Sequence, residues 1–196
     1  MVRLDRIYTG GGDAGETSLG DGARVSKLDP RIVALGAVDE VNCTLGLAAT
    51  HAEAELAEQL RSLQQLLFDL GADLCLPLPD DASADFHRRL TSGHVAQLER
   101  QIDACTERLQ PLKSFILPGG TPAAAALHLA RAICRRAEIC VLSLHENQGV
   151  NPVIPVVLNR LSDLLFTLAR IANVNGTADI LWNPARGGAE DARESR

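Results

Sequence analysis

LAEQLRSLQQLLFDLGADL, residues 56–74, is the stretch that decides the fold. Its leucines recur at intervals of four, three, four, three and four residues, namely Leu56, Leu60, Leu63, Leu67, Leu70 and Leu74. That spacing brings side chains to one face of an α-helix, so it predicts a helix that packs against other helices.

Caps that contain proline mark two further helices. Asp29-Pro30 and Thr121-Pro122 each place a capping side chain before a proline suited to the first helical turn. The first of these helices is expected to run to about Ala49, and the second to about His145. The second has an apolar face at helical spacing, made of Leu127, Ala130, Cys134, Ala137 and Val141.

Two more helices complete the set. Thr91 or Ser92 caps one, whose apolar positions are Val95, Leu98, Ile102, Cys105 and Leu109. Asn151-Pro152 begins the other, which is expected to end near Asn173 and has its apolar face at Leu161, Leu164, Leu168 and Ile171. Prolines, acidic residues and a serine interrupt the helical pattern in residues 77–89, which are therefore expected to form a loop. Five helices with modest connections favour an all-α fold, a five-helix bundle over residues 29–184 followed by a loose tail, residues 185–196.

The overall composition agrees with packed helices. Hydrophobic residues make up 46% of the 196-residue chain and aromatic residues only 3%, a mixture that favours helices over sheets. The formal net charge of −6 argues against nucleic acid as the main partner. No apolar run is expected to be long enough to cross a membrane. Five cysteines without a Cys-x-x-Cys pair indicate reduced thiols in the cytoplasm.

The N-terminal segment, residues 1–28, is expected to be a glycine-rich loop that binds a nucleotide within the same domain. Residues 9–22 read TGGGDAGETSLGDG, a glycine density that opposes both helix and strand. Its amide N–H groups and hydroxyls can donate to phosphate, and Lys27 and Arg31 add positive charge. Gly10-x-Gly12-x-x-Gly15 matches the dinucleotide fingerprint in letters only, because no βαβ unit surrounds it. The usual P-loop pattern does not occur.

Polar residues recur at helical spacing on two helices. Closely spaced positive charge at Arg131, Arg135 and Arg136, with Glu138 nearby, invites an anion. The last helix carries a second such face, made of Asn159, Asp163, Phe166 and Arg170. Spacing alone favours the simpler interpretation that both faces are solvated surfaces. Asp39 is either exposed or buried against an arginine such as Arg131. No histidine follows a glutamate by three residues, so a ferritin-type di-iron site is excluded and no metal ligand is assigned.

Four ordered blocks, which reach nearly to Trp182, resemble the PduO-type corrinoid adenosyltransferase family (ATP:cob(I)alamin adenosyltransferases). They are residues 7–22, 29–42, 115–138 and 159–166. The resemblance implies transfer of the 5′-deoxyadenosyl group of ATP to the cobalt of cob(I)alamin, with release of triphosphate and formation of adenosylcobalamin. It also implies Mg²⁺, a homotrimer with ATP at its subunit interfaces, a reductase and an adenosylcobalamin-dependent acceptor enzyme, and neither nucleic acid nor membrane as a partner.

The resemblance also implies the site residues. The ATP-binding set is Thr9, Gly10, Gly11, Gly12, Asp13, Thr17, Ser18, Lys27, Arg135, Arg136, Glu138 and Asn159. The catalytic set is Asp39, Phe115, Arg131 and Arg135. Within it, Asp39 and Arg131 match a pair that bridges two subunits beside the corrin. Phe115 matches the aromatic that keeps the lower axial ligand away from cobalt, and Arg135 faces the leaving triphosphate.

Two departures from the family pattern accompany these assignments. Gly10 stands where relatives commonly carry a basic or polar residue, which removes one phosphate contact. The C-terminal tail offers no residue to which closure over the corrin can be assigned. A corrinoid carrier or an ATP-gated regulator is the rival function, and a purely structural bundle would leave the glycine-rich loop unexplained. The leucine face of residues 56–74 is expected to leave apolar surface for the trimer.

Overall fold

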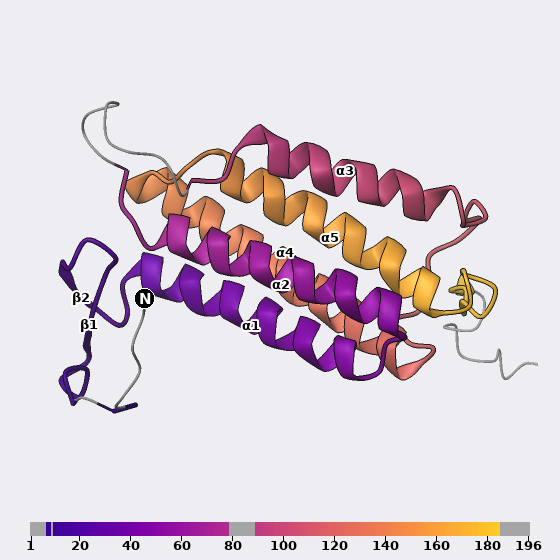
Figure 1. The fold of residues 1–196 in the computed structure, drawn as a ribbon, viewed down its shortest axis with the longest axis horizontal. Helices are drawn as coiled ribbons and strands as arrows, with labels where there is room; N and C mark the ends of the chain where they lie inside the picture. Colours follow the sequence, from indigo (N-terminus) through magenta and orange to yellow (C-terminus); the bar gives the residue numbers. More distant parts are fainter. Residues whose placement is uncertain (1–6, 9, 79–88, 185–196) are drawn as a thin grey trace, which may run out of the picture.

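The computed structural model describes residues 7–8, 10–78 and 89–184; Thr9 and the predicted tail, residues 185–196, lie outside them. Within the described residues, five helices pack side by side along one long axis (Figure 1). They are α1 Pro30–Thr50, α2 Ala54–Leu74, α3 Ser92–Thr106, α4 Pro122–Gln148 and α5 Val153–Ala172. The prediction of an all-α, five-helix bundle is confirmed.

The helix boundaries follow the capping residues. The Asp29 carboxylate accepts from the Arg31 N–H at 2.8 Å, and the Thr121 hydroxyl accepts from the Ala124 N–H at 3.1 Å. α4 continues three residues beyond the predicted His145. α3 ends before Leu109, which is buried in the turn that follows the helix.

The core lies between the helices and contains the leucines of α2. Leu60, Leu67 and Leu70 are at most 1% exposed, and Leu63 and Leu74 are buried with them. The expectation that this face is left over for a trimer is therefore wrong, because the bundle itself covers it. Large apolar side chains are exposed elsewhere, on α1, α2 and α4: Val33, Leu47, Phe68, Leu129, Ile139 and Leu142.

α1 is long and apolar enough to cross a membrane by length and composition alone, which contradicts the expectation that no run would be. Its buried face packs against α2 and α4, and it carries Asp39 and Glu40 near its middle. A core helix of a bundle passes the same test, because its inward face must be apolar.

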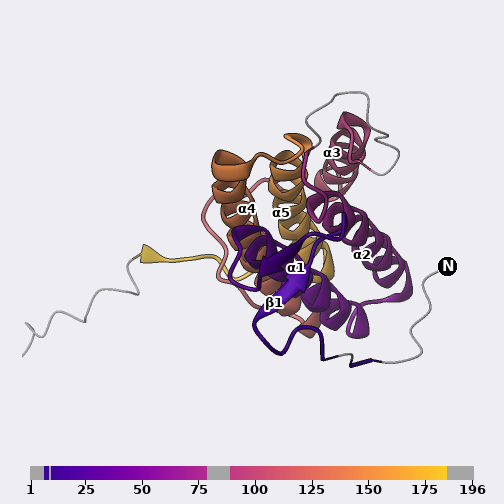
Figure 2. The ribbon, with the colours of Figure 1, turned by 90° about the vertical axis from the view of Figure 1, so that its left-hand side faces the viewer.

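The glycine-rich segment is not entirely irregular. Strands β1 (Glu16–Ser18) and β2 (Arg24–Ser26) form an antiparallel hairpin at the end of the bundle where α1 begins (Figures 1 and 2). The expectation of a loop without strands is wrong here, because each three-residue strand lacks glycine. The glycines lie in the turns, where Gly22 takes a φ of 87°.

Candidate functional site

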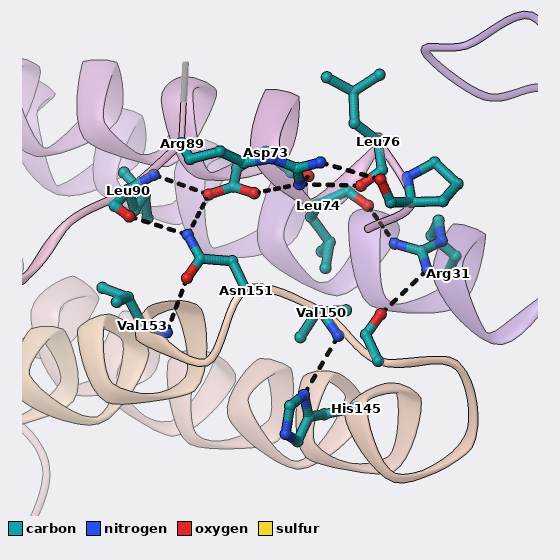
Figure 3. Close-up of polar contacts among 12 residues, drawn as sticks. Arg31, Asp73, Leu74, Leu76, Arg89, Leu90, His145, Val150, Asn151 and Val153 are labelled. Atoms are coloured by element: carbon teal, nitrogen blue, oxygen red, sulfur yellow. Dashed lines mark hydrogen bonds and ion pairs between the residues drawn. The ribbon is translucent and has the colours of Figure 1, made fainter. Parts of the chain in front are cut away.

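A buried polar network fixes the end of the bundle beneath the hairpin (Figure 3). The Asp73 carboxylate accepts from Arg89 at 2.7 Å, from the Leu90 N–H at 2.8 Å and from the Asn151 side chain at 2.7 Å. The Arg89 guanidinium also donates to three backbone carbonyls, those of Asp73, Leu76 and Pro77. The end of α2 is thereby held to the start of α5.

Arg31 belongs to this network rather than to a phosphate site. It is 2% exposed, and its guanidinium donates to the Leu74 carbonyl at 2.8 Å and to the Gly149 carbonyl at 3.4 Å. Burial lowers its pKa, while the Asp29 charge opposes that shift. The positive charge expected from Arg31 therefore ties α1 to the ends of α2 and α4.

The hairpin rests on this end of the bundle. The Gly20 N–H donates to the Cys75 carbonyl at 3.2 Å, and a Cβ at Gly20 would come within 2.9 Å of Leu76. Closer to the N-terminus, the Asp13 N–H bonds the Gly10 carbonyl at 3.2 Å. Lys27 lies over this turn, since a Cβ at Gly12 would be 3.0 Å from its ammonium nitrogen. Backbone amides, hydroxyls and a lysine thus gather in one place, the combination that suits phosphate.

The middle of the bundle holds the second part of the predicted ATP-binding set. The Asn159 side chain on α5 donates to the Glu138 carboxylate on α4 at 3.0 Å. Arg136 forms an ion pair with Glu40 of α1. Arg135 is exposed and borders a small pocket that Asp163 and other residues also line.

A larger cavity of about 510 Å³ adjoins this region. Its lining is largely apolar and comes from α4, α5 and the segment before α4: Leu112, Ser114, Phe115, Ile116, His128, Arg131 and Phe166. Phe115 is 78% exposed and meets Trp182 edge to face, with ring centroids 6.2 Å apart. The Trp182 N–H donates to the Phe115 carbonyl at 2.7 Å, which fixes the two residues together. A cavity of this size with a largely apolar lining is typical of small-molecule and cofactor sites.

Sequence reasoning missed two residues at this cavity. His128 precedes Arg131 by one helical turn, so its spacing was a signal; it is 4% exposed and lies edge to face with Phe166. Burial, followed by the Arg131 charge, lowers its pKa and favours the neutral imidazole. Trp182 gave no signal, because no periodicity connects it to Phe115.

Two polar atoms near the cavity lack hydrogen-bond partners in the described part of the chain. They are Nδ1 of His128 and Nε of Arg131, both buried. Buried polar groups are nearly always satisfied. Arg131 Nε is a donor, whereas Nδ1 of a neutral histidine donates or accepts according to the tautomer. A cavity wall with unsatisfied polar atoms fits a ligand, or a second chain, that brings hydrogen-bond partners.

Asp39 and Arg131 do not pair within one chain. Asp39 is exposed and lines a groove of about 420 Å³ between α1 and α2, where Phe68 is also exposed. Arg131 instead points to the cavity between α4 and α5. The open alternative for Asp39 is thereby settled in favour of an exposed carboxylate in the single chain.

The two parts of the predicted ATP-binding set also lie apart. The hairpin packs near Arg31, whereas Glu40, the partner of Arg136, comes nine residues later on α1. Nine residues of helix span about 13 Å. Thr9 lies outside the described residues.

The family model for cobalamin adenosyltransferases matches residues 7–172, which include every feature described above except Trp182. The chain belongs to the cobalamin adenosyltransferase family. It is 44% identical to the corrinoid adenosyltransferase of Mycobacterium bovis over 93% of this chain and 95% of that protein. It is 40% identical to the corrinoid adenosyltransferase MMAB of Mus musculus, over 87% of this chain and 74% of that protein.

A solved structure of this family has the same fold. A variant of the PduO-type ATP:corrinoid adenosyltransferase from Lactobacillus reuteri, complexed with cobalamin and ATP, superposes with a TM-score of 0.84 and 38% identity. The match covers 91% of this chain and 97% of that one. A second variant of that protein, complexed with ATP, gives a TM-score of 0.81 at the same identity.

Side chains of the types that ligate metal ions are scattered in the described residues. Across residues 10–78 and 89–184, no three His, Cys, Asp or Glu side chains cluster in a way that could hold a metal ion.

Proposed function

We propose that this chain carries out its family's reaction at a composite site, completed where two copies meet. The reaction is the transfer of the 5′-deoxyadenosyl group of ATP to the cobalt of cob(I)alamin. The cobalt(I) electron pair forms the bond to C5′, the C5′–O5′ bond breaks, and triphosphate leaves with the electron pair of the broken C5′–O5′ bond. No proton has to move, so the protein's part is to position two substrates and stabilise the departing charge.

The observation that carries the proposal is the adjacency of an apolar cavity and a cationic strip on α4. Arg131 lines both the 510 Å³ cavity and the smaller pocket that holds Arg135. We assign the corrinoid to the cavity, with Phe115 on its open side excluding a lower axial ligand and water. We assign the leaving triphosphate to Arg135, Arg136 and Lys27, and the nucleotide to the pair Glu138–Asn159. Mg²⁺ would accompany the triphosphate and neutralise part of its charge.

A homotrimer would unite the parts that one chain keeps separate. The glycine-rich hairpin of one copy would complete the Arg135 region of the next, and Asp39 would reach Arg131 across the interface. Three observations support this: the separation of the two parts, the unpaired Arg131 Nε, and the exposed apolar side chains of α1 and α4. Exposed apolar side chains that gather in one patch are typical of protein interfaces.

The activity is tested by anaerobic incubation of the pure protein with reduced cobalamin and Mg-ATP. We expect the visible spectrum of the cobalt–carbon bonded product together with one triphosphate per product. Arg135→Ala should lower kcat/KM by roughly a hundredfold, because a charge that faces the leaving group is removed. The matched control is Arg61→Ala, which removes an exposed arginine of α2 paired only with Glu58. Corrinoid binding without triphosphate release would instead indicate the rival carrier function.

The assembly is tested by charge reversal. Asp39→Arg and Arg131→Asp should each weaken association in analytical ultracentrifugation and lower turnover. The double variant should restore both, because the pair is re-formed with its charges exchanged. If both single variants stay trimeric, or the double variant rescues neither property, the bridging pair is excluded.

The setting of the reaction is also part of the proposal. The five cysteines are free thiols in the structure, which suits the reducing cytoplasm. A reductase would supply the cobalt(I) state, and an adenosylcobalamin-dependent enzyme would accept the product.

A further inference from the structure

The guanidinium of Arg24 lies inside the glycine-rich loop, although nothing assigned Arg24 to the site. Its Nη2 donates to the Gly11 carbonyl at 2.7 Å, and its Nη1 donates to the Ser18 hydroxyl at 3.3 Å. Nη2 also lies 3.6 Å from a carboxylate oxygen of Glu16. One planar group on β2 thus joins the glycine turn to β1 through two separate nitrogens, a fork that guanidinium has and ammonium lacks.

The turn that Arg24 holds has little else to shape it. Gly10, Gly11 and Gly12 are consecutive, and Gly10 takes a φ of 71°, so the free chain has many conformations to lose. The turn's own backbone bonds, at 3.2 Å from the Asp13 N–H and 3.1 Å from the Gly15 N–H, lie at the upper end of the ordinary range. A ligand that had to order this turn would bind more weakly by that entropy.

The contact also sets the direction of a peptide group. In a trans peptide the carbonyl and the following N–H point in opposite directions. When Arg24 holds the Gly11 carbonyl, the Gly12 N–H therefore points away from Arg24. No acceptor among the described residues bonds that N–H, and the Lys27 ammonium approaches the same glycine. An unpaired amide beside an ammonium is what a phosphate oxygen requires.

We propose that Arg24 is a positioning residue for ATP. By holding the Gly11 carbonyl and the Ser18 hydroxyl, it keeps the loop in the shape that presents amide N–H groups to the triphosphate before ATP arrives. The inference rests on the proposed function, in which Lys27 of this loop binds the triphosphate and the hairpin completes the Arg135 region of the next copy. Arg24 shapes the site and does not touch the reacting atoms, so it acts on ATP binding rather than on the chemical step.

The test compares three variants of the full-length protein. Arg24→Met keeps an apolar side chain of similar length and removes the guanidinium group. Arg24→Lys keeps the charge but replaces the planar fork of two terminal nitrogens with a single nitrogen. Arg61→Met is the control, since it removes an exposed arginine of α2 outside the hairpin. The first readout is amide hydrogen exchange of residues 10–18 without nucleotide, and the second is KM for ATP against kcat, with the Kd of Mg-ATP from calorimetry.

We expect loop amides to exchange several-fold faster in both Arg24 variants and at the wild-type rate in the control. KM and Kd for ATP should rise roughly tenfold, the effect of about one charge-assisted hydrogen bond, with kcat within twofold and KM for cobalamin unchanged. Full rescue by lysine would show that charge alone matters and overturn the positioning role. Unchanged exchange, or a fall in kcat at constant KM, would also overturn it. A different outcome would contradict the proposed function and not the role of Arg24 in shaping the loop. In that outcome the Arg24 variants exchange faster, but the wild-type protein does not bind Mg-ATP.

Discussion

Removing the buried charge at Asp73 tests whether the end of the bundle depends on one ion pair. The Asp73 side chain is fully buried and that of Arg89 is 13% exposed, and their closest atoms are 2.7 Å apart. In Asp73→Asn, the amide oxygen can replace Oδ2 and keep its bonds to the Leu90 N–H and to Asn151. The amide NH₂ then faces the Arg89 guanidinium, so two donors oppose each other in a buried site.

Breaking one side of a buried pair costs about 3–5 kcal/mol. Because Asp73→Asn keeps two of the three hydrogen bonds, we expect a loss of about 3 kcal/mol of unfolding free energy in urea titrations. Arg89→Met should cost a similar amount. The double variant should cost about 2 kcal/mol less than the sum of the two, because the unpaired charge disappears. The exposed pair Arg61–Glu58, with side chains 57% and 72% exposed, should show a coupling of about 0.5 kcal/mol or less. If the double variant instead costs the sum of the two single variants, within about 0.5 kcal/mol, the two charges are not coupled and the buried ion pair does not stabilise this end of the bundle.

Three further predictions follow from single side chains. Phe115→Ala should slow formation of the cobalt–carbon bond and leave the Kd of Mg-ATP within about twofold, because Phe115 lines the cavity and not the glycine-rich loop; equal loss of ATP affinity would contradict this. Burial lowers the pKa of His128 below its ordinary 6.5, so the unfolded chain binds more protons in the window below that value. Unfolding free energy should therefore fall as pH decreases through that window, and His128→Asn should flatten this part of the pH profile; identical profiles would exclude the effect. Burial, with Glu138 and Asp163 next, raises the pKa of Cys134 to about 12, so mass-spectrometric mapping should find it unalkylated at pH 8 until the chain unfolds.

Local signals were sufficient for the helices and for much of the site chemistry. The Asp29-Pro30 and Thr121-Pro122 caps begin helices where expected, because capping depends on neighbours within one turn. Glu138 and Asn159 were assigned to one site, and the structure joins them by a hydrogen bond. The hairpin was missed because glycine density was averaged over a segment whose strands themselves lack glycine.

Contacts between distant segments could not be predicted in the same way. Arg31 looked like a loop cation, yet it is buried against α2 and the end of α4, with partners 43 and 118 residues away in the sequence. Trp182 meets Phe115 only because a short bridge between Ile116 and Leu181 returns the chain after α5 to the segment before α4. Neither contact leaves a periodic trace in the sequence.

By itself, the sequence determined the class of fold, the helix positions and, through four ordered motif blocks, the family. Periodicity and capping act over a few residues, so they are readable along the chain. Only the tertiary structure decided which polar residues are buried and hydrogen-bonded between helices, and which lie at a cavity or in a loop. It placed Asp39 in a groove away from Arg131, made Arg31 a core residue and brought Arg24 onto the glycine turn. Those outcomes depend on which helix faces pack together, and that packing is a property of the whole bundle.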